Sequence, residues 1–170
     1  LGGVAKGFAG TDSFTCKRHA PEGQDYGFVG EVTAVNTAPL KECITQGITP
    51  VISPTARDAD GQIYNCNADV AAAQAAIALA AKRLVFMSDV PGLLRDPADA
   101  TSLISHLDVA EVDKLKQAGI IASGMIPKVD SATTAIDAGV DKVSFVDGRI
   151  NHAVLLEIFT DEGVGTEIVK

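Results

Sequence analysis

The stretch Tyr64-Asn65-Cys66-Asn67-Ala68-Asp69 decides the fold, because it carries an extended segment directly into an Ala-rich helix. The helix is expected over 68–82, with Asn67 as its N-cap, and a continuous apolar strand is expected at 84–88. Strands that alternate with helices and have nearly continuous apolar cores are typical of parallel sheets. We therefore predict an α/β fold, with a mostly parallel sheet sandwiched between helix layers.

The same alternation extends toward both ends of the chain. Short segments rich in β-branched and aromatic residues at 4–9, 13–19 and 28–35 predict strands with hairpin-like turns near the N-terminus. The other expected elements are a helix at about 38–46, strands at 48–53 and 62–65, helices from 108 to 119 and from 127 to 138, a strand at 142–146, a helix at 152–159 and a strand at 164–169. Asp108 and Glu111 form a capping-box-like pair at the start of one helix.

Length and composition bound the organisation of the chain. The 170 residues, 46% of them hydrophobic, suffice for one well-buried core and are too few for two large domains. The sequence begins at Leu1 without a methionine and enters strand-like sequence at once, which favours a C-terminal fragment of a larger protein. We expect a single domain over residues 1–170.

Charge and cysteine content exclude several classes of protein. The net charge of −8 argues against a nucleic-acid surface, which needs clustered Lys and Arg. No apolar run is long enough for a membrane span, and no segment resembles a signal peptide. The three cysteines, Cys16, Cys43 and Cys66, include no Cys-x-x-Cys pair, which fits a reducing compartment better than disulfides or a zinc site. A cytoplasmic protein is expected.

Two asparagines in the opening stretch are candidate ligand-binding residues. Residues two apart in an extended segment share a face, so Asn65 and Asn67 can both present an amide to one small polar ligand. Asn67 and Asp69 also have a simpler interpretation, since an N-cap asparagine and a first-turn aspartate stabilise a helix. Asn65 precedes the cap and has no capping duty. Cys66, between the asparagines, is interpreted as a packing residue, with a reactive thiol as the lesser alternative.

A second candidate site lies at Gly124-Met125-Ile126-Pro127-Lys128. Pro127 suits the first position of a helix, which places Lys128 in a first turn where the helix dipole disfavours a cation. A cation at a position where the helix dipole disfavours it points to a functional role for that residue. A lysine ammonium together with free N–H groups at a helix start predicts an anion site, and phosphate is the usual ligand there.

Two aspartates mark the expected ligand edge of the sheet. Asp89 and Asp147 each follow an apolar strand, and ligands of such sheets bind outside the carboxyl ends of the strands. Each also has a structural interpretation, because Ser88-Asp89-Val90-Pro91-Gly92 and Asp147-Gly148-Arg149 both read as turns. His152 is interpreted as a surface or capping residue.

Five motifs in register carry a resemblance to a known family. They are Gly27-Phe28-Val29-Gly30-Glu31-Val32, Asp60-Gly61-Gln62-Ile63-Tyr64-Asn65-Cys66-Asn67-Ala68-Asp69, Ser88-Asp89-Val90-Pro91-Gly92-Leu93-Leu94, Ser123-Gly124-Met125-Ile126-Pro127-Lys128 and Phe159-Thr160-Asp161-Glu162-Gly163-Val164-Gly165-Thr166. In this order they resemble the amino acid kinase family, and within it the acetylglutamate kinases. The part present is similar to the nucleotide-binding half, and the family's N-terminal acetylglutamate-binding domain is mostly absent.

The resemblance implies phosphoryl transfer from ATP, with Mg²⁺, to the side-chain carboxylate of N-acetyl-L-glutamate in arginine biosynthesis. It implies that Lys128 neutralises charge on the transferring group, that Asp69 orients that lysine, and that Asn65 holds the acetylglutamate with support from Asn67. It assigns adenine and ribose contacts to Asp89, Val90, Pro91, Gly92, Leu93, Leu94, Ile120, Ile121 and Ala122, and it assigns no residue to a metal.

The last motif resembles the arginine-inhibited members of the family. There the resemblance implies that Glu157, Gly163 and Gly165 help to hold arginine, and that the full-length protein is a homo-oligomer. Another amino acid kinase, acting on carbamate, aspartate, glutamate or UMP, and a non-catalytic module that senses nucleotide or arginine remain the alternatives.

Overall fold

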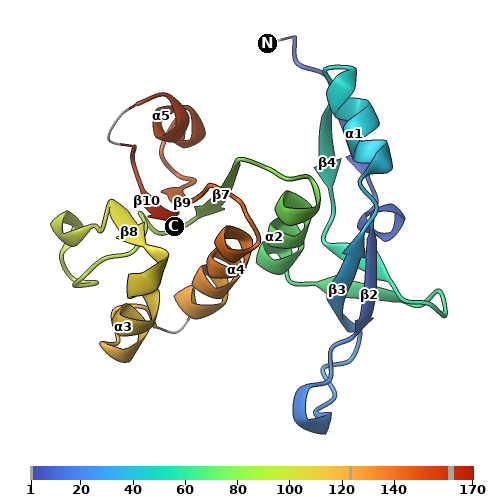
Figure 1. The fold of residues 1–170 in the computed structure, drawn as a ribbon, viewed down its shortest axis with the longest axis horizontal. Helices are drawn as coiled ribbons and strands as arrows, with labels where there is room; N and C mark the ends of the chain where they lie inside the picture. Colours follow the sequence, from blue (N-terminus) through green and yellow to red (C-terminus); the bar gives the residue numbers. More distant parts are fainter. Residues whose placement is uncertain (1, 123, 161–162) are drawn as a thin grey trace. The chain divides into compact units, whose positions relative to one another are not determined.

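The computed structural model describes residues 2–122, 124–160 and 163–170. Ser123, Asp161 and Glu162, which belong to two of the motifs above, lie outside the described residues. The chain divides into two compact units, Leu1–Leu79 and Ala80–Lys170 (Figure 1). The single nucleotide-binding domain expected over 1–170 stays a prediction.

The first unit contains a small parallel sheet. Strand β1 (Ala5–Phe8) pairs with β4 (Thr49–Ile52), and helix α1 (Ala38–Thr45) runs into β4 through the left-handed turn at Gly47, whose φ is 72°. Helix α1 buries Leu40 and Cys43, while β1 itself is largely exposed. The short 3-10 turns η1 (Gly10–Asp12) and η2 (Pro21–Gly23) flank the next strand.

Four further strands of the first unit close into a small barrel in the order β2 (Phe14–Arg18), β3 (Val29–Val35), β6 (Ile63–Cys66) and β5 (Thr55–Arg57). Strands β2 and β3 pair antiparallel, which confirms the predicted hairpin. Strand β5 was not predicted, because three residues are too few to show an alternating pattern.

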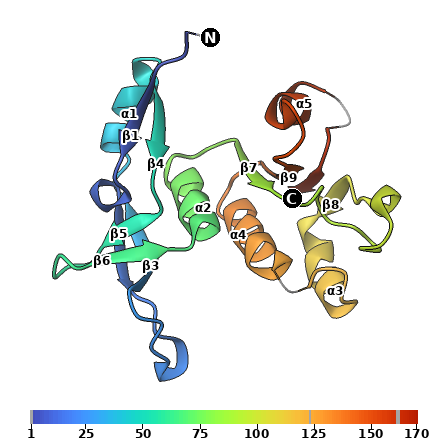
Figure 2. The ribbon, with the colours of Figure 1, turned by 180° about the vertical axis from the view of Figure 1, so that it is seen from behind.

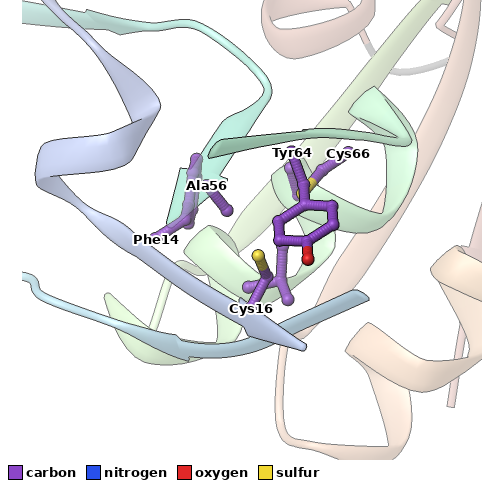
Figure 3. Packing of buried hydrophobic residues seen from close by; sticks show 7 residues of the cluster. Phe14, Cys16, Ala56, Tyr64 and Cys66 are labelled. Atoms are coloured by element: carbon purple, nitrogen blue, oxygen red, sulfur yellow. The ribbon is translucent and has the colours of Figure 1, made fainter. Parts of the chain in front are cut away.

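The interior of the barrel holds a cluster of buried side chains (Figure 3). The cluster comprises Phe14, Cys16, Val32, Ala56, Tyr64, Cys66 and Ala71, the last from helix α2 (Ala68–Ala78). Gly30 lies where strand β3 passes this cluster, and a Cβ there would meet the Cβ of Tyr64 at 2.8 Å and the Sγ of Cys16 at 2.9 Å. A glycine at that position lets the strands close around the aromatic ring.

The second unit is built on a four-stranded sheet in the order β7 (Arg83–Ser88), β9 (Lys142–Asp147), β10 (Thr166–Val169) and β8 (His106–Asp108). The β7–β9 and β8–β10 pairs are parallel, whereas β10 runs antiparallel to β9. Helices α4 (Met125–Asp137) and α5 (Ala153–Phe159) lie on opposite sides of this sheet (Figures 1 and 2). The predicted α/β class with helix layers is thus confirmed.

Two helix starts differ from the prediction. Asp108 ends β8 and caps a 3-10 turn, η4 (Val109–Glu111), by accepting a 2.7 Å hydrogen bond from the N–H of Ala110, so helix α3 (Val112–Gln117) begins four residues later than expected. Helix α4 begins at Met125 rather than Pro127. Proline is tolerated at the third helical position because the first N–H groups of a helix have no intrahelical partner.

Candidate functional site

The carboxyl ends of β7 and β9 form one edge of the second unit's sheet. The parallel register ends at the pair Ser88 and Asp147, and the N–H of Gly148 donates to the carbonyl oxygen of Ser88 over 2.8 Å. Asp89 follows directly and is exposed. The structure therefore brings Asp89 and Asp147 to the same edge, as the strand pattern predicted.

Asp147 at this edge is held by Arg149 in a closed turn. Its Oδ1 accepts from the Nε and the backbone N–H of Arg149, both at 2.9 Å, and its Oδ2 accepts from Nη2 at 2.8 Å. The Arg149 side chain and backbone N–H lower the pKa of Asp147 to about 2. The turn interpretation of Asp147-Gly148-Arg149 accounts for all of these contacts.

The pairing makes stability depend on pH in a defined direction. Because the folded-state pKa of Asp147 lies below the usual 3.8, its contribution is complete above about pH 5 and is lost as the pH falls toward 2. In Arg149→Gln we expect the pKa of Asp147 to return toward 3.8. The difference in free energy of unfolding between Arg149→Gln and the native protein should then shrink as the pH falls from about 5 to 2.

Urea unfolding at a series of pH values measures this difference. Arg95→Gln serves as the control, since Arg95 is also an exposed arginine in a loop of this unit. Stability curves of Arg149→Gln and the native protein that run parallel across this range would contradict the expectation.

The loop after β7 carries most of the residues assigned to nucleotide contact. Ser88 closes its first turn, with its Oγ accepting from the N–H of Val90 at 3.3 Å. The nine assigned residues differ in exposure: Asp89 and Ala122 are exposed, Val90, Pro91, Leu94 and Ile120 are half-buried, and Gly92, Leu93 and Ile121 are buried. The side chains of Leu93 and Ile121, 2% and 1% exposed, are buried in the core rather than open to a ligand.

Lys128 lies at the fourth residue of α4 and is half-buried. The helix start is shaped by the N–H of Met125, which donates to the carbonyl oxygen of Ala122 over 3.1 Å, and by Pro127, whose carbonyl accepts from Ser131 Oγ at 2.9 Å. A cation near a helix N-terminus opposes the macrodipole and attracts an anion. The anion site expected at Lys128 stays a prediction.

The first unit carries the two asparagines and Asp69. Tyr64 and Cys66 are buried and Asn65 is exposed, so the alternation of an extended segment holds, and the backbone N–H of Asn65 donates to Phe28 over 2.9 Å. Asn67 caps α2, with its Oδ1 accepting from Asp69 at 2.9 Å and from Val70 at 3.1 Å. Capping accounts for the contacts of the Asn67 side chain, whereas the exposed side chain of Asn65 has no capping role.

Substitution of Asn67 is expected to reveal its structural role. Asn67→Ala removes the acceptor of two helix N–H groups and should lower the free energy of unfolding by about 1 kcal/mol. Asn67→Ser, which keeps a capping oxygen, should lower it by only a few tenths of that amount. Denaturant unfolding measures both values, and equal losses for the two variants would contradict a capping role.

Cys66 behaves as a packing residue. It is 2% exposed, and burial together with the neighbouring Cys16 raises the pKa of its thiol to about 11. A thiol that stays protonated is a poor nucleophile. The packing interpretation of Cys66 therefore has the support of the structure.

A pocket of about 530 Å³ opens between the sheet of the second unit and the end of α5. It is lined by Glu157, Gly163 and Gly165, which the sequence singled out, and by Arg83, Leu103, Ser105, His106, Lys142, Thr160, Val164 and Glu167. Glu157 is 6% exposed, and its Oε2 accepts from the N–H of Val164 at 2.9 Å. Gly163 has a φ of 64° and lies so close that a Cβ would meet that oxygen at 2.6 Å.

The charged lining of this pocket was missed by sequence reasoning. Glu167 pairs with Lys142, and its Oε1 lies 3.4 Å from His106 Nδ1. Arg83 Nη1 donates to the carbonyl oxygen of Glu157 over 3.3 Å. The available signal was a cationic residue at the first position of a largely apolar strand, which holds for Arg83 in β7 and Lys142 in β9.

Within the described ranges, no group of three or more His, Cys, Asp or Glu residues could hold a metal ion. The helices that the structure describes include none that is long and apolar enough to span a bilayer.

The mixed sheet with its helices and its loop edge identifies the chain as an α/β protein. Comparison with known proteins identifies its family. The model of the amino acid kinase family matches residues 5–147, and the chain belongs to this family.

Acetylglutamate kinases are similar over nearly the whole chain. The one from Syntrophomonas wolfei is 47% identical and covers 99% of this chain, and the one from Clostridium beijerinckii is 46% identical with the same coverage. The chain spans 59% and 60% of these two relatives.

Solved structures share the fold. N-acetylglutamate synthase from Neisseria gonorrhoeae, complexed with coenzyme A and L-arginine, is 28% identical, with a TM-score of 0.84 over 96% of this chain and 37% of its own. Carbamate kinase from Giardia lamblia bound to AMP-PNP is similar in fold alone, with 18% identity and a TM-score of 0.65 over 84% of this chain and 47% of its own.

Proposed function

We propose that this chain is the nucleotide-binding part of a kinase that transfers the γ-phosphoryl group of ATP to the side-chain carboxylate of N-acetyl-L-glutamate. The product would be N-acetylglutamyl phosphate, in arginine biosynthesis. The observation that carries the proposal is the 47% identity to an acetylglutamate kinase across 99% of the chain. Residues 1–170 would act as one nucleotide-binding domain that is inactive alone; the chain spans 59% of the length of that relative.

The residues present fit a reaction that needs electrostatic help rather than a base. A carboxylate is already ionised at neutral pH, so the difficulty lies in bringing it to an anionic phosphate. Lys128 would neutralise charge on the transferring group, and Asp69 would orient cations rather than remove a proton. Asn65 would hold the acceptor, with Asn67 keeping its capping role beside it.

The nucleotide would lie along the edge formed by the loop after β7. Asp89 is exposed there, and Leu93 is buried within the loop. Exposed Ala122 and buried Ile121 precede α4 and would complete the contacts to the nucleotide. Mg²⁺ commonly binds through substrate phosphates with one or two carboxylates, so it would reach this edge together with ATP. When bound, it would neutralise phosphate charge.

Acceptor competition in the full-length protein tests the proposal. ADP release should depend on N-acetyl-L-glutamate and not on carbamate, aspartate, glutamate or UMP. Turnover with one of those acceptors would identify another amino acid kinase. Nucleotide binding without turnover of any acceptor would support a sensing module instead.

For the pocket of Glu157, Gly163 and Gly165, we infer an arginine site. The buried Glu157 carboxylate and Glu167 offer acceptors to a guanidinium, while Arg83 and Lys142 offer donors to a carboxylate. The related synthase structure that contains L-arginine supports the inference. Calorimetric titration with L-arginine tests the site, and D-arginine serves as the control ligand.

The homo-oligomer and the cytoplasmic location expected from the sequence stay part of the proposed function.

A further inference from the structure

A buried hydrogen bond joins the loop after β7 to the first residue of β10. The backbone N–H of Leu93 donates to Thr166 Oγ1 over 2.8 Å, although the two residues lie 73 positions apart. Thr166 is 0% exposed. No water competes for a group in such surroundings, so this bond helps to fix where the loop lies.

The turn around this bond is packed without spare room. Gly92 has a φ of 143°, and a Cβ there would meet Thr166 Oγ1 at 2.5 Å and Leu103 Cδ1 at 3.0 Å. On its other side, the carbonyl oxygen of Leu93 accepts from the N–H of Ile104 at 2.8 Å. The turn is therefore held from two directions, and only one of the two contacts comes from a side chain.

Thr166 is itself anchored by the sheet rather than by the loop. It lies opposite Phe145 in the antiparallel β9–β10 pair. The preceding Gly165 approaches β9 so closely that a Cβ would fall 1.9 Å from the carbonyl oxygen of Phe145. A hydroxyl fixed in this way can impose a position on a loop that carries no regular secondary structure.

We propose that Thr166 is a positioning residue for nucleotide binding: its hydroxyl fixes the Gly92–Leu93 turn and thereby sets the course of the loop from Asp89 to Leu94. This inference rests on the proposed function, because the proposed function gives the loop a nucleotide to bind. Thr166 itself would touch no substrate. It acts through the backbone N–H of Leu93.

The test compares three variants of the full-length protein by calorimetry with Mg²⁺ and AMP-PNP. Thr166→Val removes the acceptor at nearly equal volume and should weaken binding about tenfold, whereas Thr166→Ser keeps the hydroxyl and should bind within about twofold of the native protein. Ser144→Ala is the matched control, since Ser144 is also 0% exposed in this sheet and its Oγ has no hydrogen-bond partner among the described residues. Its affinity should be unchanged.

Hydrogen exchange at the Leu93 amide supplies a readout that does not depend on nucleotide. Exchange should accelerate at least tenfold in Thr166→Val and stay slow in Thr166→Ser and Ser144→Ala. If Thr166→Val does not fold, Thr166→Cys replaces it, because a thiol of similar size is a weak acceptor.

The outcomes separate this inference from the proposed function. Native affinity in Thr166→Val, with a fast-exchanging Leu93 amide, would overturn the positioning role and leave the nucleotide site intact. Slow exchange in that variant would show that Ile104 alone holds the turn, and would also overturn it. No binding of AMP-PNP by the native protein would overturn the proposed function, and this inference with it.

Discussion

Replacing Lys128 with alanine in the full-length kinase is expected to lower turnover by about 100-fold or more. In the proposed reaction an anionic carboxylate is brought to an anionic phosphate, so a cation near the transferring group would act on the transition state. Lys128 is half-buried near the start of α4, where N–H groups add to its field. Steady-state ADP release at saturating ATP and acceptor measures the effect.

Lys116→Ala is the matched control for the loss of a cation in the same unit. Lys116 Nζ lies 2.6 Å from Asp130 Oδ1 in an ion pair with a largely exposed carboxylate between α3 and α4. Pairs of this kind contribute little to stability, and this one lies outside the predicted site. Turnover within about twofold of the native value is expected. An unchanged turnover in Lys128→Ala would remove Lys128 from the mechanism.

Gly165→Ala is expected to destabilise the protein by about 3 kcal/mol or more. The new Cβ would fall 1.9 Å from the carbonyl oxygen of Phe145, which belongs to the backbone of the central strand β9. A side chain could rotate away from such a contact, but a strand paired on both sides cannot. Denaturant unfolding followed by circular dichroism measures the loss.

Gly148→Ala provides the comparison within the same unit. Its Cβ would meet the nearest atom, the carbonyl oxygen of Ser88, at 3.4 Å, an ordinary contact distance. Its stability should change by about 0.5 kcal/mol or less. Similar losses in the two glycine variants would mean that the approach of Gly165 to Phe145 is not what requires a glycine.

Local patterns predicted most of the elements of this fold. The β-branched and aromatic segments at 4–9, 13–19 and 28–35 predicted strands with hairpin-like turns. Strands β2 and β3 form such a hairpin, whereas β1 pairs in parallel with β4. The apolar segment at 142–146 predicted a buried strand, and β9 is buried from Val143 to Asp147. The strands Thr55–Arg57 and His106–Asp108 were missed, because three residues show no period and Asp108 reads equally well as a helix cap.

Features of the site that depend on distant residues could not be predicted. The 73-residue separation of Leu93 and Thr166 leaves no local signal for their hydrogen bond. The cations Arg83 and Lys142 meet in one pocket only because β7 and β9 are neighbours. By contrast, Asn67 could be assigned to capping from sequence, since its acceptor role depends only on the next turn of chain.

The two-stranded sheet of the first unit bears on how this chain behaves in solution. Within the described residues, β1 and β4 pair only with each other, so each has a free edge of backbone N–H and C=O groups. Val51 in β4 is 57% exposed, and Lys6 in β1 is the kind of charge that discourages edge pairing. A sedimentation or light-scattering measurement on these 170 residues alone would therefore report strand-to-strand self-association together with any native assembly. The mass of any native assembly has to be measured on the full-length protein.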